Sequence, residues 1–307
     1  MILVIGKESG VFYHRLQVPY EDMLMRGYMV KFGTIEDLDK LKGHVSYLVV
    51  NRGIASKDHR QFRAMLNAYN IKLILDIDDW WNLPHNHSSK SQVKGTHIIN
   101  TIKIADQLHT TNGYLAEKLQ KINPYVPIWI LPNAIDPRRE QWMGEKTKSD
   151  TLRVGYLGAL HHDYDLQWNG IDLSGHESWA LEYYQQAIKS KHAFPPKDYT
   201  NYGELYRDID VSIAPLAPTE FNRCKSNLKA IEAGFTKTCL IAQDMHPYTP
   251  FLNSTNSILC KTAYDWKEAL ETITPDVARG LAEQLYEDVQ FFHIDNINNT
   301  REKCFEE

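Results

Sequence analysis

Short, mostly apolar runs alternate with helix-like segments along this chain, and that alternation is the feature that most restricts its fold. Runs of four to six residues without a polar face suit strands that are buried on both sides. Because helical patterns lie between the runs, the sequence predicts an α/β protein with parallel sheets. One set of strands is expected at 2–5, 47–50, 72–76, 107–110 and 128–131, and a second set at 152–157, 211–215, 238–242 and 257–260.

Helices are expected in the intervals between these strands. Pro19 favours the start of one, because a proline at the first helical position loses no hydrogen bond. Other helices are expected at 57–69, 113–122, 178–190, 227–234 and 265–272. The stretch 163–202 contains no convincing strand, which favours a second domain that is trimmed relative to the first.

The chain length and one polar stretch predict two domains. A chain of 307 residues is long enough for about two domains. Residues 144–151 lack apolar anchors and precede a new strand, as an interdomain linker would. We therefore expect two doubly wound Rossmann-like domains, 1–147 and 151–275, that face each other across a cleft. Residues 276–307 are expected to form a helical segment that packs back on the first domain and has an unanchored acidic end.

The charge balance argues against a general nucleic-acid binder. The 34 Lys and Arg residues and 39 Asp and Glu residues give a net charge of −5, whereas phosphate-backbone binders concentrate positive charge. A local groove made by Arg52, Lys57, Arg60 and Arg63 would keep DNA open as a partner. A solvated helix face is the preferred interpretation of those four residues.

The cysteines and the apolar runs predict a cytoplasmic protein. Cys224, Cys239, Cys260 and Cys304 form no C-x-x-C pair, which argues against structural zinc and against a disulfide framework. The apolar run at 2–5 is too short for the core of a signal peptide. No run approaches the roughly 18 apolar residues that a membrane span needs.

Polar residues follow the first and third predicted strands, where an open parallel sheet binds its ligands. Gly6 and Gly10 would let the backbone approach a ligand closely, and Arg15 could meet a phosphate or a carboxylate. After the third strand come Asp76, Asp78 and Asp79, three carboxylates that need partners, protonation or solvent to coexist.

Three interpretations of this acidic cluster stay open. Some of the carboxylates could cap a turn or a helix. They could bind a hard cation. Asp76 and Asp78 could also be the nucleophile and acid of a phosphatase-like hydrolase, although Trp80 stands where such an enzyme has a small hydroxylated residue.

Histidines follow two of the predicted strands. His85 and His87 come after the acidic cluster, and His161 and His162 come after the first strand of the second domain. Neighbouring histidines are more often surface residues than ligands. The position of His161 makes it the favoured one, since an imidazole there could hydrogen-bond a phosphate or a sugar hydroxyl.

The densest cluster of anion-binding residues lies at 215–234. A strand ends at Pro215, and a helix is expected to begin near Ser226 or Asn227. A helix start presents free N–H groups and a positive dipole end, and Arg223 and Lys225 come just before it. This combination predicts a diphosphate site, with Glu232 positioned to accept hydroxyls of an adjoining ribose.

An ordered set of motifs resembles the retaining sugar-nucleotide glycosyltransferases of the GT-B fold, the large "group 1" class. No single motif is decisive, but the set runs from the N-terminus to about residue 250 in the family's order. The matching segments are Tyr13-His14-Arg15 with Pro19, Asp78-Asp79, Ala105-Asp106 with 110–115, Leu131-Pro132-Asn133-Ala134-Ile135-Asp136, Val154-Gly155-Tyr156-Leu157-Gly158, and Phe221-Asn222, Lys225-Ser226, Lys229 and Glu232-Ala233-Gly234.

The resemblance implies a compact transferase that moves a sugar from a nucleotide diphosphate to a hydroxyl acceptor with retention of configuration. It implies no metal and no cofactor, because cations and helix dipoles would neutralise the leaving diphosphate. Taken together, the residue patterns and the resemblance assign Asp78, Asp79, His161 and Lys225 to catalysis; Gly10, Gly158, Asn222, Arg223, Lys225, Ser226, Asn227, Leu228 and Glu232 to the donor; and Arg15, His85 and His87 to the acceptor.

Two departures from the family pattern support an alternative, a non-catalytic binder of sugar nucleotides or glycans. The family often carries a glutamate eight positions before Glu232, where this chain has Cys224, and Glu220 is the nearest substitute. The family also often has an Arg and a Lys after the second domain's first strand, and residues 159–165 contain neither. The acceptor could be a glycan or, as in some compact members, a hydroxymethylated DNA base.

Overall fold

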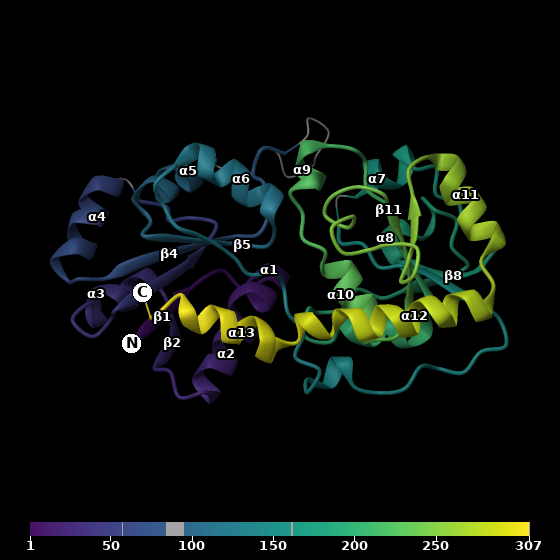
Figure 1. Ribbon diagram of the computed structural model, residues 1–307, viewed down its shortest axis with the longest axis horizontal. Coiled ribbons are helices and arrows are strands. Elements are labelled where there is room, and N and C mark those ends of the chain that lie inside the picture. Colours follow the sequence, from purple (N-terminus) through teal and green to yellow (C-terminus); the bar gives the residue numbers. More distant parts are fainter. Residues whose placement is uncertain (57, 84–94, 161, 307) are drawn as a thin grey trace.

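The computed structural model describes residues 1–56, 58–83, 95–160 and 162–306, which form two lobes that each contain one parallel six-stranded sheet (Figure 1). The first sheet has the order β2-β1-β3-β4-β5-β6. Its strands are β1 (Ile2–Ile5), β2 (Val30–Gly33), β3 (Tyr47–Asn51), β4 (Lys72–Ile77), β5 (Gln107–Thr110) and β6 (Ile128–Ile130).

The second sheet has the order β12-β11-β10-β7-β8-β9. The chain leaves β7 toward one edge and returns to the other side of β7 with β10, so the strand order reverses between these two strands. The strands are β7 (Arg153–Tyr156), β8 (Glu177–Leu181), β9 (His192–Phe194), β10 (Val211–Ala214), β11 (Cys239–Gln243) and β12 (Ile258–Cys260).

Helices cover both sheets. In the first lobe they are α1 (Gly10–Phe12), the π-helical turn η1 (Tyr13–Gln17), α2 (Val18–Met25), α3 (Ile35–Leu41), α4 (His59–Ala68), α5 (Gly95–Ile104) and α6 (Gly113–Ile122). The short helix η2 (Glu140–Trp142) comes just before the predicted linker. The later helices are α7 (Asp163–Trp168), α8 (Glu182–Gln185), η3 (Tyr202–Asp208), α9 (Glu220–Arg223), α10 (Leu228–Phe235), α11 (Ala263–Thr272), α12 (Pro275–Val289), η4 (Gln290–Phe292) and α13 (Ile294–Lys303).

The α/β prediction is confirmed, and each predicted strand is present with its ends within one residue of the expected position. The expectation of a trimmed second sheet is wrong, because β8 and β9 give this sheet the same number of strands as the first. The helix expected over 178–190 is confirmed only for the short α8 (Glu182–Gln185). Ser178 and Trp179 instead pair with Val154 and Gly155 of β7, so sheet pairing overrides a helix-like pattern.

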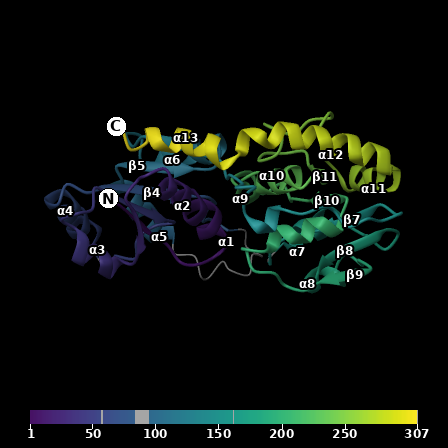
Figure 2. The same ribbon diagram turned by 90° about the horizontal axis from the view of Figure 1, so that it is seen from below.

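The C-terminal helix α13 lies against the first lobe (Figure 2). The two segments that connect the lobes pair with each other, since the amide of Ile135 donates to Phe292 and the amide of Ile294 donates to Ile135. The end of the chain is not unanchored as expected, because the ring of Phe305 contacts Tyr47 edge-on at 4.9 Å between ring centres.

Asn298 fixes α13 to α2 through buried hydrogen bonds, and its replacement by alanine is expected to destabilise the protein. The side chain is 0% exposed, and its amide donates to the carbonyl of Pro19 and to the carboxylate of Asp22, each at 2.8 Å. Since each buried group left unpaired costs about 1–3 kcal/mol, Asn298→Ala should lower the free energy of unfolding by at least that amount in urea titrations. The exposed Asn299 is the matched control, and equal effects of both substitutions would contradict the assignment.

No helix within the described ranges is long and apolar enough to cross a membrane. The four cysteines are buried thiols. The cytoplasmic location stays a prediction.

Candidate functional site

A cavity of about 680 Å³ lies between the two lobes, at the carboxyl ends of the strands where each strand order reverses. Ligands of open α/β sheets bind at such reversal points. The loops that follow β1, β4, β7, β8 and β10 line the cavity together with the start of α10. Nine residues predicted from the sequence lie in this lining: Gly10, Arg15, Asp78, Asp79, Gly158, Lys225, Ser226, Leu228 and Glu232.

The acidic cluster at the end of β4 is bound by two arginines. Both carboxylate oxygens of Asp76 accept hydrogen bonds from Arg15, at 3.0 and 2.6 Å, and both side chains are buried. Asp78 accepts two hydrogen bonds from Arg52, each at 2.8 Å. Burial favours a raised pKa for Asp78, but the charge of Arg52 outweighs it and the pKa is lowered. Because its guanidinium group is paired with Asp76, Arg15 is not available to bind an acceptor.

The ion pair with Arg15 also argues against Asp76 as the nucleophile of a phosphatase. Asp76 is 0% exposed and does not line the cavity. No group of three or more His, Cys, Asp or Glu side chains could hold a metal ion, as far as the chain is described.

Asp79 is the carboxylate of the cluster that lacks a close bidentate partner. It lines the cavity, and its nearest cation is Arg52 at 3.5 Å. Burial raises its pKa, the charge of Asp78 raises it further, and Lys225 acts in the opposite direction. A carboxyl group with a raised pKa, facing a lysine across a cleft, is typical of functional sites.

The start of α10 is a candidate anion site opposite Asp79. Asn227 precedes the helix, and no side chain in the described part of the chain caps it. The amide of Ala230 donates to the carbonyl of Asn227, and the amides of Leu228 and Lys229 have no partner among the described residues and stay open to a ligand. Lys225 precedes Asn227 by two residues and lines the same cavity, and its ammonium group lies 4.4 Å from the centre of the Phe221 ring.

The loop that carries this anion site is bonded to the other lobe. The side-chain amide of Asn112 donates to the carbonyl oxygens of Cys224 and Lys225, at 3.1 and 3.0 Å. The amide of Asn133 donates to the hydroxyl of Ser226 at 2.9 Å. The first lobe thus fixes the conformation of a loop that belongs to the second.

Glu232 lies on α10, at the floor of the cavity, and is 2% exposed. One carboxylate oxygen accepts from the ammonium of Lys229 at 2.8 Å and from the hydroxyl of Tyr206 at 2.9 Å. Burial favours a lower pKa for Lys229, but Glu232 raises the pKa well above its ordinary value. The other oxygen of Glu232 has no partner among the described residues, so a ligand hydroxyl can reach it.

Several predicted residues do not line the cavity. Asn222 is buried behind it, Arg223 is exposed outside it, and Asn227 only precedes α10. Cys224 packs in the core of the first lobe, where burial raises its pKa to about 12. Glu220 is not the substitute for the missing family glutamate, because it points to Tyr114 and Lys118 instead. His85, His87 and His161 lie outside the described residues.

The sequence analysis missed the pair His162 and Asp165. His162 lines the cavity, and its Nδ1 lies 2.6 Å from a carboxylate oxygen of Asp165. The spacing of three residues at the start of a helix was the available signal, because it brings both side chains to one face. His161 was favoured only because of its place after the strand. It also missed His14, whose pKa burial lowers to about 4.

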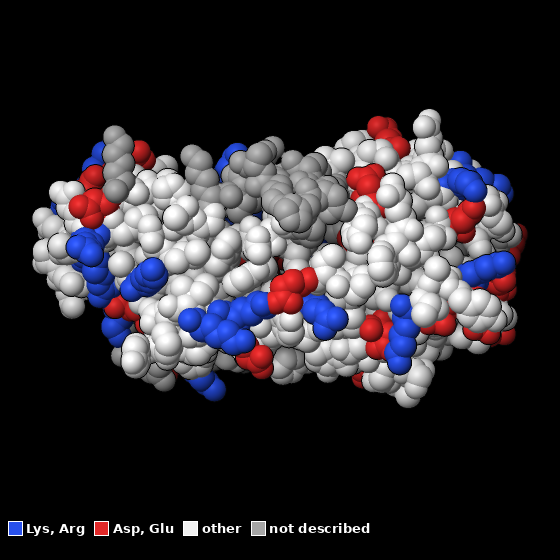
Figure 3. Space-filling model, turned by 90° about the horizontal axis from the view of Figure 1, so that it is seen from above, with Lys and Arg blue, Asp and Glu red and all other residues white. Residues whose placement is uncertain are grey.

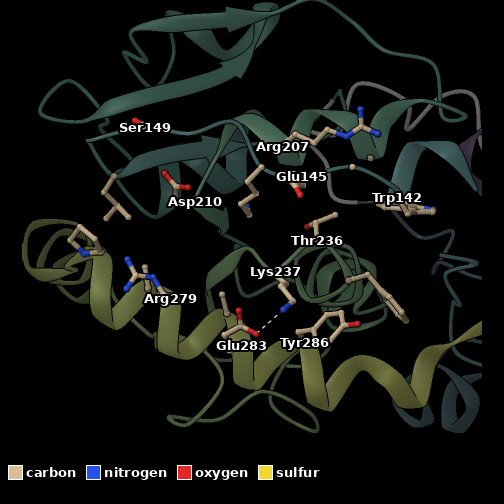
Figure 4. Close-up of a pocket in the computed structure, with 18 of the residues that line it drawn as sticks. Trp142, Glu145, Ser149, Arg207, Asp210, Thr236, Lys237, Arg279, Glu283 and Tyr286 are labelled. Carbon is tan, nitrogen blue, oxygen red and sulfur yellow. Dashed lines mark hydrogen bonds and ion pairs between the residues drawn. The ribbon is translucent and has the colours of Figure 1, made fainter. Parts of the chain in front are cut away.

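A second cavity, of about 650 Å³, lies between the linker and α12 (Figure 4). It contains none of the predicted site residues. Its charged groups are largely paired, with Lys237 bonded to Glu283 at 2.9 Å and Asp210 to Arg153. We therefore take the cavity between the lobes as the functional site.

The basic groove suggested for DNA is not assembled. Arg52 is bound to Asp78, and Arg63 makes two hydrogen bonds to Asp106. Lys57 lies outside the described residues. On the face shown in Figure 3, acidic side chains interrupt the basic ones.

Two facing Rossmann-like lobes with a site between them constitute the GT-B fold of glycosyltransferases, and comparison with solved structures identifies this fold. A sucrose-phosphate synthase from Thermosynechococcus elongatus aligns with a TM-score of 0.73 at 12% identity, covering 100% of this chain and 98% of that chain. HepE from Anabaena in complex with UDP-glucose aligns with a TM-score of 0.68 at 11% identity, covering 100% and 99%.

A glycosyltransferase from Rickettsia africae has a TM-score of 0.66 at 12% identity, covering 99% of this chain and 97% of that chain. No protein-family model matches the sequence, and no curated protein matches it. At these identities the comparisons establish the fold, and the activity depends on the residues of the site.

Proposed function

We propose that this protein is a glycosyltransferase that moves a sugar from a nucleotide diphosphate to a hydroxyl acceptor. The proposal depends above all on one observation, the uncapped start of α10 with Lys225 beside it and Glu232 below it, facing a cavity between the lobes. The helix start and Lys225 suit a diphosphate, and the free oxygen of Glu232 suits a ribose hydroxyl. HepE, which shares the fold, was solved with UDP-glucose, so UDP-glucose is the first donor to test.

In this proposal each side of the cavity has its own part in the reaction. Negative charge develops on the leaving diphosphate, so Lys225 and the amides of α10 stabilise the transition state more than the ground state. Asp79 lies on the first lobe's side, where it would bind the hydroxyl of the acceptor glycan. We propose retention of the anomeric configuration, in line with the resemblance of the sequence motifs.

Transfer is tested by incubating the protein with labelled UDP-, GDP-, ADP- and CDP-sugars and a panel of glycan acceptors. Product formation supports the proposal. Binding of a sugar nucleotide without turnover across all acceptors would favour the non-catalytic binder that Cys224 suggests. No binding of any of these donors by folded protein would contradict both functions.

Removal of divalent metal ions is expected to leave the transfer rate unchanged. Lys225 and the helix start supply the positive charge that a bound metal would otherwise supply. The measurement is the initial rate before and after dialysis against excess EDTA. A rate that collapses in EDTA and returns with magnesium would refute metal independence.

Retention is tested on the same product, whose anomeric configuration is given by its proton NMR coupling constant. A product with inverted configuration would refute retention.

A further inference from the structure

His162 lies in the loop after β7 and lines the cavity beside the anion site. Its backbone amide donates to the hydroxyl of Tyr184 at 2.6 Å, and that hydroxyl donates to the carbonyl of Ala159 at 2.9 Å. Its ring is held by Asp165, at 2.6 Å from Nδ1. The imidazole therefore has a fixed position at the edge of the cavity.

The environment of Asp165 determines which ring nitrogen carries the proton. One carboxylate oxygen of Asp165 accepts hydrogen bonds from the amide of Ala217 at 2.8 Å and from the side chain of Asn222 at 2.7 Å. The other oxygen faces Nδ1 of His162. A carboxylate that accepts at both oxygens needs Nδ1 to be the donor, so in the neutral imidazole Nε2 carries the lone pair. No described residue bonds to Nε2.

The charged groups around His162 come from three elements. Asp165 lies on α7, Lys225 lies before α10, and Asp79 follows β4 on the opposite lobe. Burial lowers the pKa of His162 and Lys225 lowers it further, while Asp165 and Asp79 act in the opposite direction. The ring is therefore neutral at pH 7 until another negative charge arrives beside Lys225.

We propose that Nε2 of His162 takes up a proton when the diphosphate of the donor binds, so that His162 becomes the second cation of the anion site. This inference rests on the proposed function. The proton comes from solvent, Nδ1 keeps its own proton on Asp165, and Nε2–H donates to a phosphate oxygen. His162 thereby supplies the charge that residues 159–165, which contain no Arg or Lys, otherwise lack.

Proton uptake is measured by titrating UDP-glucose into the protein in a calorimeter, in buffers of different ionisation enthalpy. UDP-glucose is suitable because neither of its phosphates titrates near neutral pH. We expect about one proton to be taken up per donor bound between the two pKa values of His162. The association constant should then fall by up to about tenfold per pH unit as the pH rises through that window, because the complex holds the extra proton.

Two variants distinguish this role from a structural one. His162→Asn should weaken binding by about ten- to a hundredfold at low pH and abolish proton uptake, because a hydrogen bond between charged groups is lost. His162→Lys should bind the donor with no pH dependence. The control is His246→Gln, since His246 lies outside the cavity against the carbonyl of Arg223 and should not affect proton uptake.

The outcomes separate this inference from the proposed function. Donor binding without proton uptake, and with a flat affinity between about pH 5.5 and 8.5, would overturn the inference and leave the transferase standing. If no UDP-, GDP-, ADP- or CDP-sugar binds to the folded protein, the proposed function fails and this inference fails with it.

Discussion

Replacing Lys225 with alanine is expected to lower kcat for sugar transfer by about 10²–10³-fold, the usual cost of removing one group that stabilises developing negative charge. Lys225 lies beside the uncapped start of α10, and Asp79 faces it from the other lobe. Its ammonium group makes a cation–π contact with Phe221 and no close ion pair within the described part of the chain, so its charge is available to the leaving diphosphate. The measurement is the steady-state rate at saturating donor.

Arg223 is the matched control for this substitution. It is a cation two residues before Lys225, and the sequence predicted that both residues bind the donor, but Arg223 is exposed and does not line the cavity. Arg223→Ala should keep the wild-type rate, and both variants should keep the wild-type thermal midpoint. Equal losses in the two variants would mean that the anion site is misplaced.

The strands were predictable because burial on both faces leaves a local pattern. β1 and β5 are present with the bounds expected from their residues. β8 was not predictable in this way, because the residues from Ser178 to Ser190 also suit a helix and only pairing with β7 decides between the two. β9, with three residues at the edge of its sheet, is too short to carry a pattern.

The part of the site that lies in one continuous segment was also predictable. Lys225, Ser226 and Glu232 line the cavity because a strand end, a loop and a helix start follow each other directly in the chain. The ion pairs of the acidic cluster were not predictable, since Arg15 and Arg52 precede their partners by 61 and 26 residues. Sequence spacing cannot show which carboxylate is neutralised and which faces a ligand, because the order of the strands decides it.

The buried pair of Arg15 and Asp76 gives the largest effect that we expect on stability. Asp76→Asn or Arg15→Met should each lower the free energy of unfolding by about 3–5 kcal/mol, because either change leaves one buried charge without its partner. Arg15 also donates to the carbonyl of Leu131 at 2.6 Å, so the pair joins η1 to the ends of β4 and β6. Chemical denaturation with a fixed m-value measures the loss.

The double variant Arg15→Met with Asp76→Leu separates this structural role from a catalytic one. Apolar residues of similar volume often replace a buried ion pair at little cost, so the double variant should recover most of the stability that each single variant loses. A phosphatase nucleophile would behave differently: Asp76→Asn would abolish hydrolysis in a protein that unfolds at the wild-type denaturant concentration. That result would return Asp76 to the active site. The expected one leaves Asp78, paired with Arg52, and Asp79 as the carboxylates of the cluster that line the cavity.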